Sequence, residues 1–245
     1  MSKYTYNKEY FNNIDTPDKA YWFGFVCADG CITRYHKNDH LWSMGLELTL
    51  QSDDKPHLEK YRRALRANVP IQDRTLRLKA TGKEYGACRC TIACTNMCKA
   101  LIRNGCTPSK SLTLQFPTDD VVPPELIWHF VRGYFDGDGL FKQYNGAHQK
   151  HTVFSLSGTQ PFLSKLADLF QACGVSITDK AIKSGKSQIY ELRLYGIANI
   201  KKALDLIYAH STDETRLDRK YETYVHADFV DGRQLQVHTS MIGPD

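Results

Sequence analysis

Alternating apolar and polar residues predict that several stretches of the chain are half-buried β-strands. Between residues 41 and 50, Leu46, Leu48 and Leu50 alternate with polar residues, as on a strand with one buried face. Further strands are predicted at residues 74–79, 85–94 and 188–195. Apolar residues at helical spacing predict helices at residues 56–67, 96–104, 162–173 and 197–210.

An earlier helix has a clear start signal. Thr16, Pro17 and Asp18 supply a capping hydroxyl, a proline suited to the first turn and an acid at the positive end of the helix dipole. The helix is expected to run to about Ala28, where Gly30 can cap it.

The segment from Trp22 to Gly30 is repeated at Val131 to Gly139. Small residues and acids coincide at a constant offset of 109 positions, in the pairs Gly24/Gly133, Ala28/Gly137, Asp29/Asp138 and Gly30/Gly139. Downstream, residues 48–51 parallel 154–157, and residues 99–101 parallel 202–204. A series of matches kept in order indicates two copies of one fold.

Each copy is predicted to follow the order αββαββα, which gives an α+β protein with a pseudo-two-fold axis. The expected division is an N-terminal repeat over residues 1–116, a proline-bounded linker over 117–124, a C-terminal repeat over 125–225 and a tail over 226–245.

The small residues of the repeated segment suggest how the two copies meet. Gly24 and Ala28 are four residues apart, as are Gly133 and Gly137, so each pair lies on one helix face and allows close packing. A two-fold arrangement of these helices brings the acids that follow, Asp29 and Asp138, together.

Two adjacent carboxylates repel unless they share a proton or bind cations. Mg²⁺ is the expected ion, and metal ions between two acids can activate water and stabilise the leaving oxygen of a phosphodiester. A single Asp-Gly is more often a turn dipeptide; the duplication is what favours a site. Asp136 is a further acid, but Cys27 occupies its partner position, and we assign it a secondary role.

The two segments resemble the paired motifs of the LAGLIDADG homing endonucleases in their monomeric, two-motif form, over roughly residues 17–225. The resemblance implies that two antiparallel sheets form a saddle over the DNA major groove. It implies that Asp29 and Asp138 bind the metal, with Ala28 and Gly137 beside them, and that Mn²⁺ or Ca²⁺ can replace Mg²⁺. It also implies double-strand cleavage at a long, specific site, leaving short 3′ overhangs.

Supporting groups are carried over from the family with the same resemblance. Gln51, with Ser157 as its counterpart, fits the polar residue at the end of the strand after the motif. Lys110 and Lys220 fit the basic residue after the last helix of each repeat, where a cation can stabilise developing charge. The alternative for each lysine is a solvated surface charge.

Composition fits this interpretation without requiring it. The chain has 32 Lys and Arg against 27 Asp and Glu, a net charge of +5, which permits a nucleic-acid partner. Residues 72–89 carry a local charge of +3 and residues 177–195 one of +2. Candidate DNA contacts in and around these stretches are Arg34, Lys37, Arg74, Arg77, Lys79, Lys83, Arg89, Lys142, Gln143, Lys180, Lys183, Lys186, Gln188 and Arg193. Because the two halves differ at nearly every such position, the expected target is asymmetric.

The remaining features exclude other classes. No apolar run approaches the length of a membrane span, and the N-terminus lacks the apolar core of a signal peptide. We therefore expect a soluble intracellular protein. The resemblance implies a monomer without an obligate protein partner, cytoplasmic in a bacterium or phage and in the organelle of translation in a eukaryote. The eight cysteines are expected to be buried free thiols, since their spacing does not match a zinc site.

Two other functions remain open. One is a DNA- or RNA-binding regulator or maturase that has this fold and does not cleave. The other is a repeat protein that binds another protein, which would lack the steep salt dependence of DNA binding. An intein is disfavoured, because the first repeat begins within about twenty residues of Met1.

Overall fold

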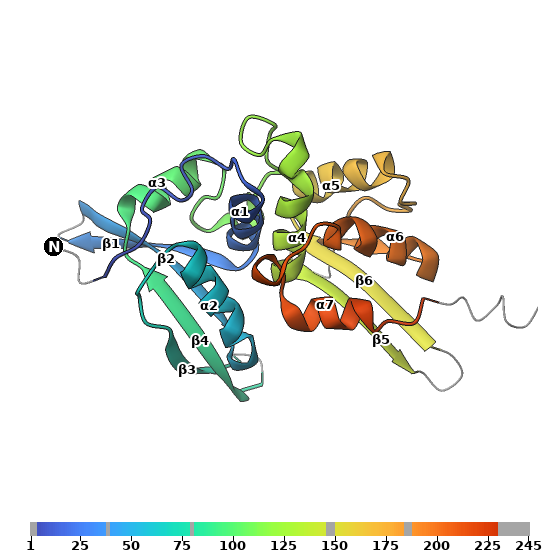
Figure 1. Cartoon of the computed structure of the whole chain (residues 1–245), viewed down its shortest axis with the longest axis horizontal. Coiled ribbons are helices and arrows are strands. Elements are labelled where there is room, and N and C mark those ends of the chain that lie inside the picture. The colour runs from blue at the N-terminus through green and yellow to red at the C-terminus, as the bar shows by residue number, and fades with distance from the viewer. Residues whose placement is uncertain (1–3, 38–39, 79–80, 146–149, 184–187, 230–245) are drawn as a thin grey trace, which may run out of the picture.

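The structure is a computed structural model that describes residues 4–37, 40–78, 81–145, 150–183 and 188–229. Its two halves lie side by side, each with an antiparallel sheet and its own helices, and helices α1 and α4 pack together between them (Figure 1). No helix in the described ranges combines the length and the apolar character that crossing a membrane requires.

Helix α1 (Pro17–Asp29) begins as the sequence predicts. The Thr16 hydroxyl accepts a hydrogen bond from the Lys19 backbone N–H at 3.3 Å, and Pro17 is the first helical residue. Gly30 follows the helix, but its φ of −72° is not left-handed. The glycine is needed for space instead: a Cβ there would lie 2.6 Å from the Val26 carbonyl oxygen.

The elements of the two halves correspond one to one for the strands and the main helices. The first half continues with β1 (Gly30–Lys37), β2 (His40–Gln51), η1 (Ser52–Asp54), α2 (Lys55–Ala64), β3 (Gln72–Arg77), β4 (Glu84–Ile92), α3 (Thr95–Arg103) and η2 (Lys110–Leu112). The second half comprises η3 (Pro124–Leu126), α4 (Ile127–Asp138), β5 (Gly139–Asn145), β6 (Lys150–Gly158), α5 (Gln160–Ala172), β7 (Ile182–Lys183), β8 (Tyr190–Leu194), α6 (Ile197–Tyr208), η4 (Asp213–Thr215) and α7 (Asp218–Val225).

The sheet topology confirms the internal repeat. The strand orders are β1-β2-β4-β3 and β5-β6-β8-β7, and every pairing between neighbours is antiparallel. Each motif helix ends directly in the first strand of its sheet, so a carboxylate at the helix end lies at the start of a strand.

The two faces of each sheet are unlike. Leu46, Leu48 and Leu50 of β2 are buried in the core, on the face where α2 and α3 pack. Phe154 and Leu156 of β6 are buried in the same way under α5. Residues at the alternate positions lie on the opposite face, which carries no helix and is called the open face below.

Helices α1 and α4 approach each other at backbone contact distance. A Cβ on Gly24 would lie 2.1 Å from the Phe130 carbonyl oxygen, and one on Gly133 would lie 1.9 Å from the Tyr21 carbonyl oxygen. The two contacts are equivalent, since Tyr21 and Phe130 differ by the repeat offset of 109. The predicted helix interface of small residues is therefore present, and only glycine fits at these two positions.

Polar contacts join the halves beside this seam. The Lys60 ammonium of α2 lies 2.7 Å from the Asp218 carboxylate of α7. The Arg219 guanidinium, also of α7, donates to both oxygens of the buried Asp54 carboxylate, at 2.8 and 3.0 Å. Helix α7 is thus fixed to the first repeat as well as to its own.

Buried His57 makes stability sensitive to acid. It lies among the rings of Tyr21, Trp22 and Phe25, and burial, with the nearby charge of Lys60, lowers its pKa to about 3. The unfolded value is about 6.5, so the stability is intact above pH 6.5 and is lost as the pH falls from there toward 3. We expect this histidine to remove about 1.4 kcal/mol of unfolding free energy per pH unit in that range.

The measurement is urea unfolding of wild type and His57→Phe between pH 7 and 4. The variant keeps an aromatic ring and cannot take up a proton, so the difference between the two proteins should change with pH at the expected slope. Exposed His226→Phe is the control and should track wild type. Parallel pH profiles for wild type and His57→Phe would contradict the assignment.

Candidate active site and nucleic-acid interface

Asp29 and Asp138 lie together where α1 and α4 end. A Cβ added to Gly137 would lie 2.3 Å from the Ala28 Cβ and 3.5 Å from the Asp29 carboxyl carbon, so the Asp29 carboxylate contacts the residue that precedes Asp138. Burial and then the charge of Asp138 raise the pKa of Asp29 to about 6, while Lys220 and Lys110 oppose the rise. Burial also raises the pKa of Asp138, against the charges of Lys110 and Lys220. The two acids therefore form one electrostatically coupled pair.

Lys110 and Lys220 occupy equivalent places beside this pair. Both are buried, with 8% of each residue exposed. The Lys110 ammonium donates to the carbonyl oxygen of Gly30, and the Lys220 ammonium donates to that of Gly139 at 2.5 Å. Burial lowers the pKa of Lys220 to about 8, against the charge of Asp136. Neither side chain is a solvated surface charge.

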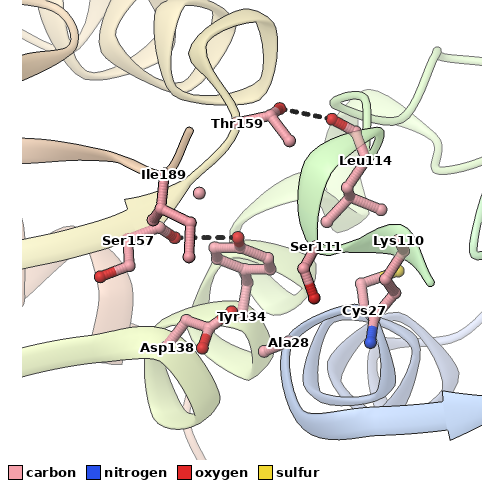
Figure 2. Close-up of a pocket in the computed structure, with 11 residues that line it drawn as sticks. Cys27, Ala28, Lys110, Ser111, Leu114, Tyr134, Asp138, Ser157, Thr159 and Ile189 are labelled. Atoms are coloured by element: carbon pink, nitrogen blue, oxygen red, sulfur yellow. Dashed lines mark hydrogen bonds between the residues drawn. The ribbon is translucent and has the colours of Figure 1, made fainter. Parts of the chain in front are cut away.

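A cavity of about 120 Å³ between the two halves is lined by Asp138 and by residues of both repeats, and Asp29 is not among its lining residues. Figure 2 shows Asp138 and Tyr134 from α4, Ala28 from α1 and Lys110 from η2 around it. Ser157 also lines the cavity, and its pairing with Glu191 places it on the open face of the second sheet. The cavity therefore extends from Asp138 to a residue of the open face.

Gln51 lies on the open face at the end of β2, away from the lining of this cavity. Its amide donates to the Asp54 carboxylate at 3.1 Å, which in turn holds Arg219. The charge of Asp54 contributes to the raised pKa of Asp29, so this cluster lies near the first acid. Sequence reasoning found Gln51 and missed Asp54 and Arg219, because only the fold brings residues 54 and 219 together.

The donor set fits a hard divalent cation. Two carboxylates and the backbone oxygens at the ends of α1 and α4 offer the oxygen ligands that Mg²⁺ prefers. No group of three or more His, Cys, Asp or Glu side chains within the described ranges is arranged to hold a metal. A cation here would therefore take part of its coordination from water or from substrate phosphate, as Mg²⁺ commonly does.

Asp136 has a structural environment, consistent with the secondary role assigned to it. Its carboxylate is 1% exposed and accepts hydrogen bonds from the hydroxyls of Tyr21 and Tyr208, at 2.8 and 3.0 Å. The backbone N–H of Leu217, just before α7, donates to it at 2.8 Å. Asp136 therefore ties α4 to α1, α6 and the start of α7.

Basic and aromatic side chains share the open faces. Strand register places four of the candidate DNA contacts there, namely Arg74, Arg89, Lys142 and Arg193. The same register adds exposed tyrosines that the sequence analysis did not propose, Tyr35, Tyr85 and Tyr144. Exposed aromatic residues between cations are typical of a surface that meets a partner.

Several other candidates lie elsewhere. Arg34 pairs with buried Met44, Arg77 with Glu84, and Lys183 with Tyr190, all on the helix-covered face. Gln143 is on that face too and bonds the backbone of Asp228 at 2.7 Å, while Lys180 pairs with Asp168 of α5. The side chains of these five residues therefore do not lie on the open face, and their contact with DNA stays a prediction. Lys83 and Gln188 are exposed next to turns. Lys79, Lys186, the side chain of Lys37 and the tail beyond residue 229 lie outside the described residues.

Comparison with known proteins agrees with this geometry. Residues 125–208 match the family model of the LAGLIDADG-like domain, whereas no curated protein sequence matches the chain. The fold is similar to the LAGLIDADG meganuclease I-AabMI bound to uncleaved DNA, with a TM-score of 0.53 and 15% identity over 91% of this chain and 93% of that chain. It is also similar to the homing endonuclease I-SmaMI bound to cleaved DNA, with a TM-score of 0.57 and 13% identity over 95% and 93%. For I-GzeII in complex with its DNA target the values are 0.55 and 13% over 94% and 93%. The chain thus contains a LAGLIDADG-like domain and has, through both halves, the fold of the LAGLIDADG homing endonucleases.

Proposed function

We propose that the protein is a metal-dependent, site-specific endonuclease that cuts both strands of duplex DNA. One observation carries the proposal: two half-buried carboxylates, Asp29 and Asp138, meet at the seam between two sheets whose open faces carry arginine, lysine and tyrosine. Repulsion between two adjacent carboxylates destabilises the folded state unless a bound cation compensates their negative charge. The similar structures are those of endonucleases bound to DNA, which supports the same function.

DNA binding and metal binding are assigned to different residues. The open faces lie against the DNA, where Arg74, Arg89 and Arg193 can contact phosphates or base edges in the major groove. Asp29 and Asp138 hold the divalent cation, for which Mg²⁺ is the proposed ion and Mn²⁺ or Ca²⁺ are substitutes. When bound, such an ion lowers the pKa of water and stabilises the charge on the leaving oxygen.

Beside the two acids, the chain supplies positively charged side chains and an environment of low dielectric constant. The ammonium groups of Lys110 and Lys220 are buried beside the acids, where they offset the negative charge of the two carboxylates. Burial of the acids strengthens each of these interactions relative to water. The chain is proposed to act as a monomer, since both acids come from one polypeptide, and to leave short 3′ overhangs.

The test is incubation of the protein with a pooled library of random duplexes and Mg²⁺, followed by sequencing of the cut ends. We expect a single long site whose two halves are not related by a palindrome, because the open faces differ between the repeats. Cut ends should disappear in EDTA. Recovery of perfect palindromes would contradict the asymmetry. Salt-sensitive DNA binding without any cut ends would instead favour the regulator or maturase alternative.

A further inference from the structure

The two buried lysines differ in how their hydrogen-bond donors are used. An ammonium group has three donors. Lys220 directs its ammonium at three backbone oxygens, those of Phe135 at 2.8 Å, Gly139 at 2.5 Å and Gly137 at 3.5 Å. Within the described part of the chain, Lys110 donates to one acceptor, the carbonyl oxygen of Gly30. Lys110 therefore keeps two donors for another partner, and Lys220 has none to spare.

The surroundings of Lys110 and Lys220 also differ, since only Lys110 lines the cavity between the two halves. Lys110 lines the same cavity as Asp138 and Ser157, as Figure 2 shows, and Ser157 is on the open face. Lys220 is not among the lining residues. Its ammonium lies 5.3 Å from the centre of the Phe135 ring, and its helix is fixed on the far side by the ion pair of Arg219 with Asp54.

The buried charges beneath the two lysines are also unequal. The second repeat has the buried carboxylate of Asp136 in the last turn of α4, between the two residues Phe135 and Gly137 whose carbonyl oxygens Lys220 contacts. The first repeat has the neutral thiol of Cys27 at the equivalent position. A buried carboxylate therefore lies beside Lys220, and the equivalent position near Lys110 carries no charge.

We propose that Lys110 contacts a phosphate of the bound DNA and that Lys220 is a positioning residue, which holds the last turn of α4, and with it Asp138, against α7. The identity of the ligand, a DNA backbone phosphate, rests on the proposed function. The division of roles rests on the contacts of this chain alone. It replaces the expectation from the sequence that the two lysines are equivalent.

The test is the salt dependence of duplex binding in EDTA, so that neither metal nor cleavage enters the measurement. The probe is the duplex recovered by library selection or, if none is recovered, a mixed-sequence duplex. Lys110→Met should lower the slope of log K against log salt concentration by about 0.9, the value for one lost phosphate contact. Lys220→Met should leave that slope unchanged and lower the thermal unfolding midpoint more than Lys110→Met does.

Lys60→Met is the matched control. Lys60 is as buried as the other two lysines and is paired with Asp218, so its loss should lower the midpoint without changing the slope. If Lys220→Met does not fold, Lys220→Gln, which keeps an N–H donor, replaces it. Equal slope changes for Lys110 and Lys220, or none for Lys110, would overturn the division of roles. A wild-type protein that binds no duplex would instead overturn the proposed function, and the division of roles with it.

Discussion

Asp29→Asn and Asp138→Asn are each expected to reduce double-strand cleavage about a thousandfold while DNA binding stays close to wild type. Asparagine keeps the size of the side chain and removes the charge that holds the cation. A bound metal ion stabilises a phosphoryl transition state by several kcal/mol, and about 4 kcal/mol corresponds to a thousandfold in rate. The measurement is single-turnover cleavage of the selected target, with duplex affinity measured in EDTA.

The same substitution should stabilise the metal-free protein. The pKa of Asp29 is raised to about 6 in the folded state, above its unfolded value of about 3.9, so folded-state stability falls as the pH rises through this range. At pH 8, Asp29→Asn should therefore add up to about 3 kcal/mol to the unfolding free energy. Exposed Asp119→Asn, in the linker, should change neither quantity. If Asp29→Asn loses activity and has a lower unfolding free energy than wild type, Asp29 has a structural role instead.

Gly133→Ala is expected to lower the unfolding free energy of the protein. Its added methyl group would lie 1.9 Å from the Tyr21 carbonyl oxygen and 2.8 Å from the Phe25 backbone nitrogen, and neither backbone atom can rotate away. Overpacking of this kind typically costs about 1–3 kcal/mol. With backbone on both sides of the contact we expect the upper end, about 3 kcal/mol, or roughly 6–12 °C in the unfolding midpoint.

The control is Gly45→Ala on the open face of β2. Its added methyl group would meet the ring of half-exposed Tyr35 at 3.3 Å, and that ring can move, so the expected loss is below about 1 kcal/mol. Differential scanning calorimetry of both variants gives the comparison. A Gly133→Ala protein with an unchanged midpoint would show that α1 and α4 do not pack backbone to backbone.

The features that repeat along the chain could be predicted from the sequence. The start of α1 at Thr16 depends on contacts within a few residues, and the duplication of the motif glycines and of the acids after them indicates that the two helices meet. The resemblance to the family supplied the lysines at positions 110 and 220, whose separation of 110 is close to the motif offset of 109. Such patterns predict the fold correctly because the helical period determines which residues lie on the same face of a helix.

Local patterns do not determine which face of a sheet each candidate DNA contact occupies. A strand alternates at every residue, so an error of one position moves every side chain to the opposite face. In β3, Arg74 and Leu76 are on the open face and Arg77 is on the covered one, although Leu76 and Leu78 suggest a buried face. In β1, the first strand of its sheet, an irregularity between Tyr35 and His36 shifts the pairing, which no local pattern reveals.

Contacts between distant segments could not be predicted at all. The pair of Asp54 with Arg219 joins residues 165 positions apart, and the three donors to Asp136 come from α1, from α6 and from the residue before α7. Burial turns these polar side chains into fixed parts of the site, because an unpaired polar group would be costly there. Their roles depend on the assembled fold rather than on any motif.

The most direct test compares wild type with the double variant Asp29→Asn/Asp138→Asn on one selected target, with each strand labelled at its end and with Mg²⁺ or EDTA. The account predicts cuts on both strands only for wild type in Mg²⁺, with equal duplex binding by the two proteins in EDTA. Cleavage of the same bonds by the double variant would contradict the claim that these two carboxylates hold the cation for strand cleavage.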